Sequence, residues 1–354
     1  MKRSTGRLPL PAAAIVALLS VMALPPVQPL AQQTELDQAR DLRAAGRLEA
    51  SAAAYRRYLK AEPASLDARL ELSQILMSQQ HLDEARTLLQ GAVEQHPGAW
   101  AVHARLAQIL LMSNELEAAE QSLVRARDLQ PSDPGVRFNL GKLLEMKQKD
   151  AEAVAEFEQF VRLSPDDPRA NNVRARLGLW YEAHDMQEAA AVQYREILLR
   201  EPSRVSAMYQ LANLEYRRGA KDDAMSLYIR VLQLDPRQYG AYNNIGFILK
   251  MRGQLAEAAS RYEKSLEIKA EQPDARFALA EIQLDLGAEA AAFDNLTRIV
   301  REAPTHPQAH YVLGRILARR GDPDGARREF DIHRRIQEEE RLRKKTASTI
   351  QENE

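Results

Sequence analysis

The sequence predicts an all-α protein built as a row of similar helix-turn-helix units, and three observations support this prediction. Ala, Leu, Glu, Arg and Gln dominate the 354 residues, and these are strong helix formers. Runs of Val, Ile, Thr and aromatic residues, which would indicate strands, are missing. Prolines and small residues recur at a fixed interval, which is typical of a repeat array rather than of two or three globular domains.

The first 31 residues have the features of an export signal. A 13-residue apolar run, Ala12–Leu24, follows a basic start and precedes Ala31. The run is shorter than the ~20 residues of a membrane span. We therefore expect a signal peptide at 1–31, cleaved after Ala23 or Ala31, and no stable membrane span afterwards. Retention of the segment as a membrane anchor is the alternative. The basic residues of the start are Lys2, Arg3 and Arg7.

Prolines set the interval of the array at 34 residues. The spacing is interrupted once, by a three-residue insertion near 168–170, and Ala270 replaces the proline at one position. The insertion predicts a longer loop or an early helix start, and a hinge between two sub-arrays is the alternative. The prolines that mark the interval are Pro63, Pro97, Pro131 and Pro165, then Pro202 and Pro236, and finally Pro304.

Other positions keep the same register. An aliphatic residue and then a small residue lie nine and ten positions after each proline, or three positions later after Pro165 because of the insertion. A large apolar residue follows sixteen positions after the small one. An alanine lies twelve positions after the small residue every time, and a less regular first copy precedes Pro63, with Ala39, Gly46 and Tyr55 in matching places. The small residues are Ser73, Ala107, Gly141, Gly178, Ala212, Gly246, Ala280 and Gly314; the alanines are Ala85, Ala119, Ala153, Ala190, Ala224, Ala258, Ala292 and Ala326.

This register has a direct physical meaning. Two helices, A and B, approach to ~8 Å only where the residues at their crossing are small. Glycine in the turn between them suits a left-handed helix end, and proline closes helix B. Six buried side chains at ~1.5–3 kcal/mol each do not order 34 residues at ~1.5 kcal/mol each, so one unit is not stable without a neighbour.

The spacing, the Leu-Gly pair, the alanine, the aromatic residue and the proline resemble the tetratricopeptide repeat, and the segment 241–246 is typical of it. The resemblance covers residues 32–340 as nine repeats and implies a right-handed α-solenoid whose A helices line the inner side. We expect residues 341–354 to form a polar capping helix and a frayed tail. A coiled-coil or partner-docking helix is the alternative for this segment.

Composition argues against several classes of function. No cysteine is present, which excludes disulfides, thiolate nucleophiles, thiolate zinc sites and a lipoprotein anchor. Without the leader, 46 basic residues face 50 acidic ones, which argues against nucleic-acid binding. His306 and His310 are spaced for a shared metal ion but lack a third ligand nearby. No catalytic motif is recognisable, so we expect no cofactor, no metal site and no enzymatic activity.

The inner side implied by the resemblance is the candidate binding site. Aromatic side chains offer contact area at low entropic cost, and Asn pairs with backbone amides of a ligand. Packing between adjacent A helices is the alternative role for each residue. A carboxylate clamp is not matched, and an asparagine ladder is only hinted at by Asn139 and Asn244. The candidate groove residues are Phe138, Asn139, Lys142, Tyr209, Asn213, Tyr216, Asn243, Asn244, Phe247 and Lys250.

These features together predict an exported scaffold that binds a protein or peptide partner in its groove, in the periplasm or outside the cell, as part of an envelope complex. The alternative is an accessory subunit of a secretion, pilus or polysaccharide-export machine, held at the inner membrane by its N-terminal segment and facing the periplasm. The partner itself is not specified by the sequence.

Overall fold

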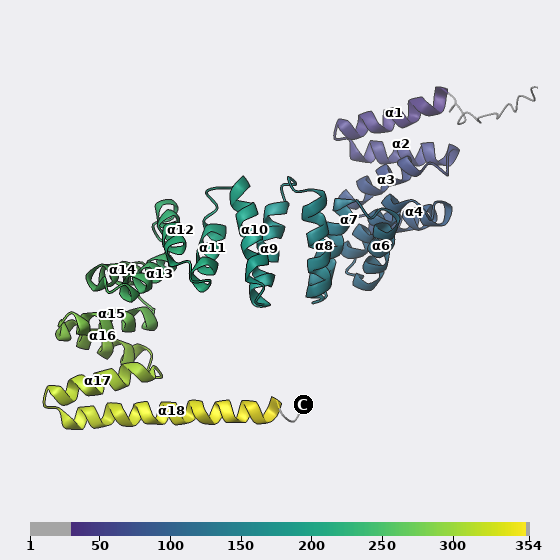
Figure 1. Ribbon diagram of the computed structural model, residues 1–354. Coiled ribbons are helices and arrows are strands. Elements are labelled where there is room, and N and C mark those ends of the chain that lie inside the picture. The colour runs from purple at the N-terminus through teal and green to yellow at the C-terminus, as the bar shows by residue number, and fades with distance from the viewer. Residues whose placement is uncertain (1–29, 352–354) are drawn as a thin grey trace, which may run out of the picture. The chain divides into compact units, whose positions relative to one another are not determined.

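The computed structural model describes residues 30–351, with side chains described for 35–346, and contains eighteen helices and no strand within that range (Figure 1). Its described residues form two compact units, the first ending at Lys149 and the second beginning at Asp150. The all-α fold class predicted from the sequence is confirmed. The predicted leader at 1–31 lies outside the described residues except for its last two positions, where the first helix begins.

Unit 1 contains the first seven helices: α1 (Leu30–Ala44), α2 (Leu48–Ala61), α3 (Leu66–Ser78), α4 (Leu82–Gln95), α5 (Trp100–Met112), α6 (Leu116–Leu129) and α7 (Pro134–Met146). Unit 2 contains α8 (Asp150–Leu163), α9 (Ala170–Ala183), α10 (Gln187–Arg200), α11 (Val205–Arg217), α12 (Lys221–Leu234), α13 (Tyr239–Met251), α14 (Leu255–Ile268), α15 (Pro273–Asp285), α16 (Glu289–Glu302), α17 (Pro307–Arg319) and α18 (Pro323–Gln351).

Odd-numbered helices are the A helices of the repeats and even-numbered helices are the B helices. In unit 1, α1 packs on α2, α3 on α4 and α5 on α6, and in unit 2 each A helix from α9 to α17 packs on the B helix that follows it. Within each unit, every B helix also packs on the next A helix, and in unit 1 the A helices α3 and α5 contact each other. The core therefore runs along each unit as a series of nearest-neighbour contacts, which is the packing expected of a repeat array.

A three-residue turn joins A to B in every repeat, and its middle residue has a positive φ. Glycine takes this place in five repeats, where the conformation carries no steric penalty. Four repeats adopt the same conformation without glycine, at φ 57° to 61°. The turn geometry therefore follows from the packing of the two helices. The four residues are Gln80, Asn114, Gln148 and Asp185.

The predicted small-residue crossing is confirmed, because all eight alanines of the helix B column are buried. In the first repeat Ser51 takes the alanine position, and its hydroxyl donates to the Ala39 carbonyl at 2.6 Å. Three glycines of the helix A column lie directly under an aromatic ring of helix B. These pairs are Gly178 with Tyr194, Gly246 with Tyr262, and Gly314 with Phe330.

A second repeated contact closes the junction between repeats. Six positions after the proline, a basic or imidazole side chain of helix A donates to the carbonyl oxygen of that proline position. Arg69 bonds the Pro63 carbonyl twice, at 2.9 and 2.6 Å. Equivalent contacts join His103 to Pro97, Arg137 to Pro131, Arg276 to Ala270 and His310 to Pro304. A backbone carbonyl in the turn between two repeats thus receives a donor.

The three-residue insertion is shared between a turn and a helix. Six residues, 164–169, join α8 to α9, where other junctions have four, and α9 has 14 residues where most A helices have 13. Asp167 accepts from the Arg169 backbone N–H at 2.8 Å and from its guanidinium at 2.8 and 2.9 Å. These hydrogen bonds lower the pKa of Asp167 to about 2. Both structural readings of the insertion, a longer loop and an early helix start, are therefore present.

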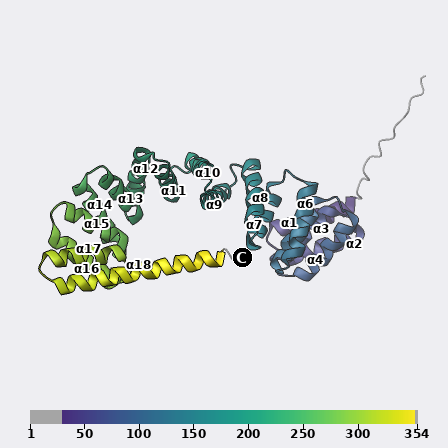
Figure 2. The ribbon, with the colours of Figure 1, turned by 60° about the horizontal axis from the view of Figure 1, so that its bottom comes forward.

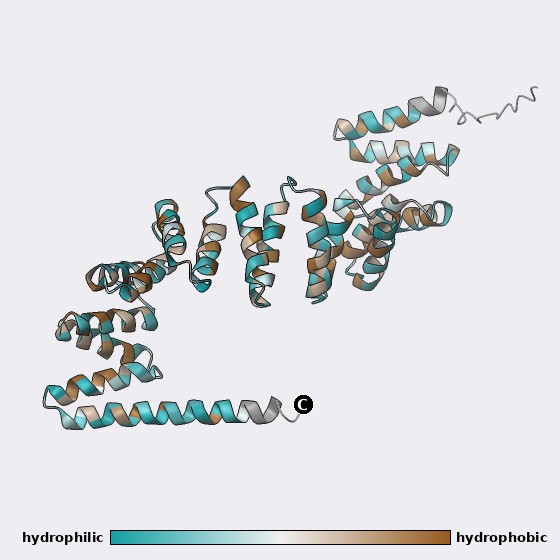
Figure 3. Cartoon of the chain, viewed as in Figure 1, coloured by the Kyte–Doolittle hydropathy of each residue, from teal (hydrophilic) through white to brown (hydrophobic). Residues whose placement is uncertain are grey.

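The last B helix, α18, continues to Gln351 without a break at residue 341. Figures 1 and 2 both show α17 lying along the first part of α18. Beyond Ile336 the described side chains are exposed and predominantly polar, as Figure 3 shows. Between residues 30 and 351, no helix is long and apolar enough to cross a membrane.

Candidate partner-binding face

We define the A-helix face as the surface formed by the fifth, ninth and twelfth positions of successive A helices. Seven of the ten candidate residues lie on or beside this face in unit 2, on α11 and α13. The other three, Phe138, Asn139 and Lys142, lie on α7 in unit 1. Each is partly buried, and Lys142 Nζ lies 3.7 Å from the Glu145 carboxylate on the same helix.

Three of the unit 2 candidates are joined in one hydrogen-bond network between α11 and α13. Asn244 Nδ2 donates to Asn213 Oδ1 at 3.1 Å and to the Tyr209 hydroxyl at 3.4 Å. Tyr228 of helix B donates to the same Asn213 oxygen at 2.6 Å. Burial raises the pKa of Tyr209. These groups are occupied with one another, so they fix the spacing of α11 and α13.

Tyr209 reaches this position because glycine leaves room for it. A Cβ at Gly240 would lie 2.5 Å from the Tyr209 hydroxyl oxygen and 3.2 Å from its ring carbon Cζ. The phenol ring of α11 therefore lies against the first turn of α13. Gly240 belongs to neither the small-residue column of helix A nor the alanine column of helix B. A glycine at the start of an A helix, outside the repeat pattern, is the sequence signal that could have indicated this close contact.

Three other side chains form an accessible apolar cluster beside the network. The rings of Tyr216 and Phe247 meet edge to face, with centroids 6.0 Å apart and planes at 81°. Phe247 is 44% exposed and Met251 is 54% exposed. The Tyr216 hydroxyl lies 3.8 Å from the Met251 sulfur. We call these three residues the apolar cluster. Met251 was not among the predicted residues, although its place at the end of α13 follows from the same periodicity.

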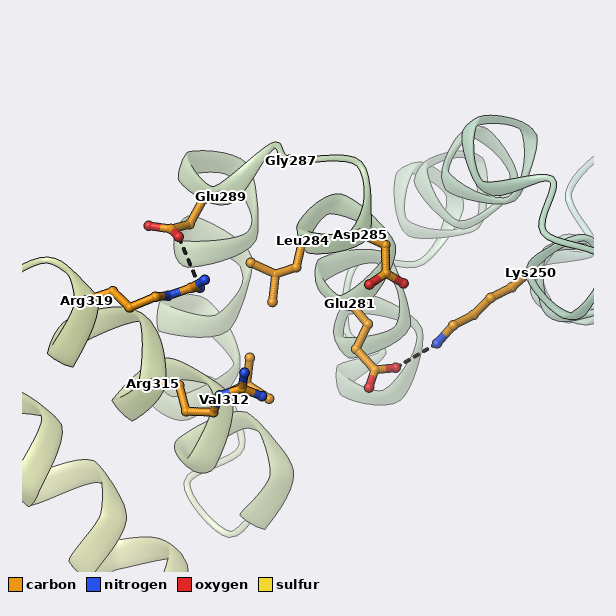
Figure 4. A pocket seen from close by; sticks show the side chains of 9 residues that line it. All are labelled: Lys250, Glu281, Leu284, Asp285, Gly287, Glu289, Val312, Arg315 and Arg319. Carbon is orange, nitrogen blue, oxygen red and sulfur yellow. Dashed lines mark hydrogen bonds and ion pairs between the residues drawn. The ribbon is translucent and has the colours of Figure 1, made fainter.

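A charged hollow of about 410 Å³ is lined by residues of α13, α15, α16 and α17, and its Lys250 precedes Met251 of the apolar cluster along α13 (Figure 4). Lys250 Nζ pairs with Glu281 at 2.7 Å across two repeats. Arg319 pairs with Glu289 at 3.0 Å on the other side of the hollow. Arg315 lies over the ring of Tyr311 at 6.0 Å. Lys250 was predicted, whereas the two arginines were missed because their repeat is far from the aromatic-rich middle of the chain.

Asn243 faces a different neighbour from the rest of the candidates. Its amide nitrogen donates to Gln272 in the turn before α15 at 2.8 Å. Its Oδ1 is buried without a hydrogen-bond partner among the described residues. Asn243 therefore acts at the junction of two repeats and is not part of the network around Asn213.

The two histidines considered for a metal have other contacts. His306 Nδ1 accepts from the Ala309 backbone N–H at 3.1 Å and so caps α17. His310 is buried between the Pro304 carbonyl and the Glu329 carboxylate, at 2.9 and 2.6 Å. Within the described part of the chain, no group of three or more potential metal ligands comes together.

Comparison with known proteins agrees with this architecture. Tetratricopeptide repeat models match residues 36–99, 71–134, 104–168, 181–239 and 294–338, and a further one matches 240–271. The C-terminal part of a TPR repeat-containing protein from Cytophaga hutchinsonii is 16% identical, with a TM-score of 0.52 over 68% of this chain and 97% of that chain. This likeness shows the fold alone.

Two curated relatives match over part of the chain. Cellulose synthase operon protein C of Pseudomonas fluorescens (strain SBW25) is 28% identical over 165 residues, which are 43% of this chain and 12% of that protein. Protein NPGR1 of Arabidopsis thaliana is 29% identical over 98 residues, 27% of this chain and 14% of that protein. The chain thus matches only a small fraction of either relative. With repeat models matching most of its length, the chain belongs to the tetratricopeptide repeat family.

Proposed function

We propose that this protein is an exported scaffold that holds a protein or peptide partner on its A-helix face, as part of an envelope complex. The observation that carries the proposal is the apolar cluster of Tyr216, Phe247 and Met251. Two of its three side chains are about half exposed, although burial on folding is what normally stabilises such residues. Exposed aromatic and methionine side chains are enriched where proteins bind one another.

The surroundings of the cluster favour binding. Asn213, Asn244 and Tyr209 hold α11 and α13 in one relative position, so the aromatic rings are ordered before a partner arrives. Preorganisation of this kind reduces the entropic cost of association. The charged hollow beside it provides a polar rim, which is the usual border of an apolar contact.

Export and location rest on the sequence of residues 1–31. A basic start and a short apolar run support a cleaved signal, and hence a periplasmic or secreted protein. The alternative is an accessory subunit of a secretion, pilus or polysaccharide-export machine that keeps the segment as an inner-membrane anchor. The resemblance to part of a cellulose synthase operon protein favours this second candidate. Fractionation with N-terminal sequencing separates the two, because an intact Met1 in the membrane fraction supports the anchored form.

The binding test compares two exposed apolar residues in unit 2. Phe247→Ala removes the ring from the apolar cluster, whereas Leu199→Ala removes a 73% exposed side chain from the B helix α10. Tagged wild-type protein and both variants are used to capture partners from an envelope extract, and captured proteins are quantified by mass spectrometry.

We expect at least one captured protein to be lost with Phe247→Ala and retained with Leu199→Ala, with unchanged helicity in both variants. A hot-spot ring contributes ~2 kcal/mol or more, which is a ~30-fold loss of affinity. Equal capture by wild type and Phe247→Ala would remove the A-helix face of unit 2 as the binding site. Turnover of a substrate by the purified protein would contradict a purely scaffolding role.

A further inference from the structure

A group of arginines lies on the A-helix face of unit 1. Arg40 of α1 donates to the Glu71 carboxylate of α3 at 2.8 and 3.1 Å, and Arg43 lies 3.6 Å from the same carboxylate. The Tyr55 hydroxyl also donates to Glu71. One carboxylate therefore already serves two guanidinium groups and a phenol. Asp67 also raises the pKa of Arg40, after the larger effect of its hydrogen bond to Glu71.

A third guanidinium, that of Arg105 on α5, has no carboxylate partner among the described residues. Its one hydrogen bond goes to the amide oxygen of Gln108, at 3.3 Å on the same helix. Arg105 is partly buried. Burial lowers its pKa, and the nearby charge of Arg43 lowers it further. This cation is partly removed from water, and no opposite charge is paired with it among the described residues.

Three arginines that are more buried than Arg105 have a different role. Arg69, Arg174 and Arg276 are each more than nine-tenths buried, and each donates to a backbone carbonyl at the junction between repeats. Those guanidinium groups hold the fold together. Arg105 makes no such contact, and its position on α5 places it on the face that the A helices present rather than at the junction.

The arrangement of the cations indicates what they bind. Arg43 at the end of α1 contacts Gln74 of α3, and α5, which carries Arg105, also packs on α3. The charge of Arg43 acts on Arg105, so the two cations are near each other. Gln74 of α3 accepts from Arg43 at 3.1 Å through its amide oxygen, which leaves its amide nitrogen available as a donor. Guanidinium groups prefer carboxylates, which they bind in pairs of parallel hydrogen bonds. Cations offered by separate helices suit several carboxylates in one segment better than a single chain end.

We propose that Arg43 and Arg105 form an anchor for an acidic segment, rich in Asp or Glu side chains, of the protein partner. The inference rests on the proposed scaffold function and specifies the chemistry of the partner. The cations of unit 1 select acidic residues of the partner. In the free protein Arg43 shares Glu71 with Arg40, and Arg105 has no carboxylate partner among the described residues; the bound carboxylates supply the missing counter-charge.

Peptide binding tests the anchor directly. The probe is a dye-labelled peptide with four Glu side chains and an amidated C-terminus, followed by fluorescence anisotropy at low salt. A matched peptide has Gln in place of each Glu, and a third is uncharged except for a free C-terminal carboxylate. Arg105→Gln removes the anchor cation, and Arg56→Gln is the control, because Arg56 is an exposed α2 residue paired with Glu84.

We expect the Glu peptide to bind at least ten-fold more tightly than the Gln peptide, and Arg105→Gln to weaken it about ten-fold, as loss of a charge-assisted hydrogen bond predicts. Arg56→Gln should leave the affinity unchanged. Absence of Glu-peptide binding up to about 1 mM, or equal binding by Arg105→Gln, would overturn the anchor. Binding of the free C-terminal peptide alone would overturn the assignment to acidic side chains.

Stability gives an independent readout. Arg105→Met keeps the length of the side chain and removes its uncompensated charge, so we expect the melting temperature of the free protein to rise by about 2 °C. A lower melting temperature would show that Arg105 stabilises the fold, and would overturn the anchor. Partner capture separates the two proposals: loss of capture with Phe247→Ala but not with Arg105→Gln would refute the anchor and keep the scaffold.

Discussion

Gly178→Ala tests the packing that defines the repeat. Gly178 lies on α9 beneath the ring of Tyr194 on α10, where a Cβ would be 2.7 Å from Cζ, 2.8 Å from Cε1 and 3.0 Å from the hydroxyl oxygen. Tyr194 is fully buried, and its hydroxyl donates to Glu182 at 2.8 Å. The ring is therefore held at both its face and its tip, and it cannot swing away without losing that hydrogen bond.

The magnitude follows from these distances. A ring atom at 2.7 Å must withdraw by about 0.7 Å to reach ordinary contact at about 3.4 Å. Overpacking of a buried site costs ~1–3 kcal/mol. Alanine in place of glycine within a helix contributes up to ~1 kcal/mol in the opposite direction. We therefore expect Gly178→Ala to lower the free energy of unfolding by about 1–2 kcal/mol.

The assay is chemical unfolding followed by circular dichroism, together with hydrogen exchange. Repeat arrays unfold in parts, and the midpoint of a chemical unfolding curve averages over all of them. Hydrogen exchange of the α9 and α10 amides instead gives the free energy of unfolding of these two helices. A double-mutant cycle supplies the control. The chain already pairs alanine with leucine at the same two columns, in Ala107 with Leu123. In the Tyr194→Leu background, Gly178→Ala should be neutral or stabilising, with a coupling of about 2 kcal/mol.

Two results would refute this reasoning. Unchanged exchange of α9 and α10 in Gly178→Ala would show that the ring moves freely. A loss of stability that is the same with and without Tyr194→Leu would show that the aromatic ring is not what opposes the added Cβ.

Three further predictions follow from contacts outside the face. In urea unfolding, Gln80→Gly should stabilise unit 1 by about 1 kcal/mol and Gly253→Ala should destabilise unit 2 by about 1 kcal/mol. Both residues have a positive φ, and no atom lies within 4 Å of the Gly253 Cβ position, so backbone conformation alone sets the effect on stability. Changes of the opposite sign would exclude backbone strain as the cause. Arg69→Met should lower the free energy of unfolding by about 1–3 kcal/mol in the same assay, because the Pro63 carbonyl loses its donors. An unchanged free energy would show that this junction contact does not stabilise the fold. The Arg169 guanidinium is the main cause that lowers the pKa of Asp167 to about 2, so Asp167 stabilises the fold above about pH 4 and this contribution is lost as the pH falls toward 2. Acid unfolding of Asp167→Asn should lack this part of the transition, and a curve identical to that of the wild type would contradict the assignment.

The sequence alone determined the architecture of this protein. The 34-residue interval, the alanine column and the prolines predicted paired helices, and the burial of Ala190 and Ala258 agrees with them. Such patterns can be recognised in the sequence because a solenoid is stabilised by contacts within a repeat and between neighbouring repeats. Each repeat therefore needs the same kinds of residue at the same positions. The family membership follows from the same positions.

Only the tertiary structure decided what individual side chains do. Tyr209 and Phe247 looked equivalent as aromatic residues of A helices, yet one lies over Gly240 within a hydrogen-bond network and the other remains accessible. Periodicity places a residue on a face of its helix, but its rotamer and its partner depend on the helix of the next repeat. For the same reason Arg105, which lies two positions beyond the junction donor His103, shows its lack of a carboxylate partner only when its neighbours are in place.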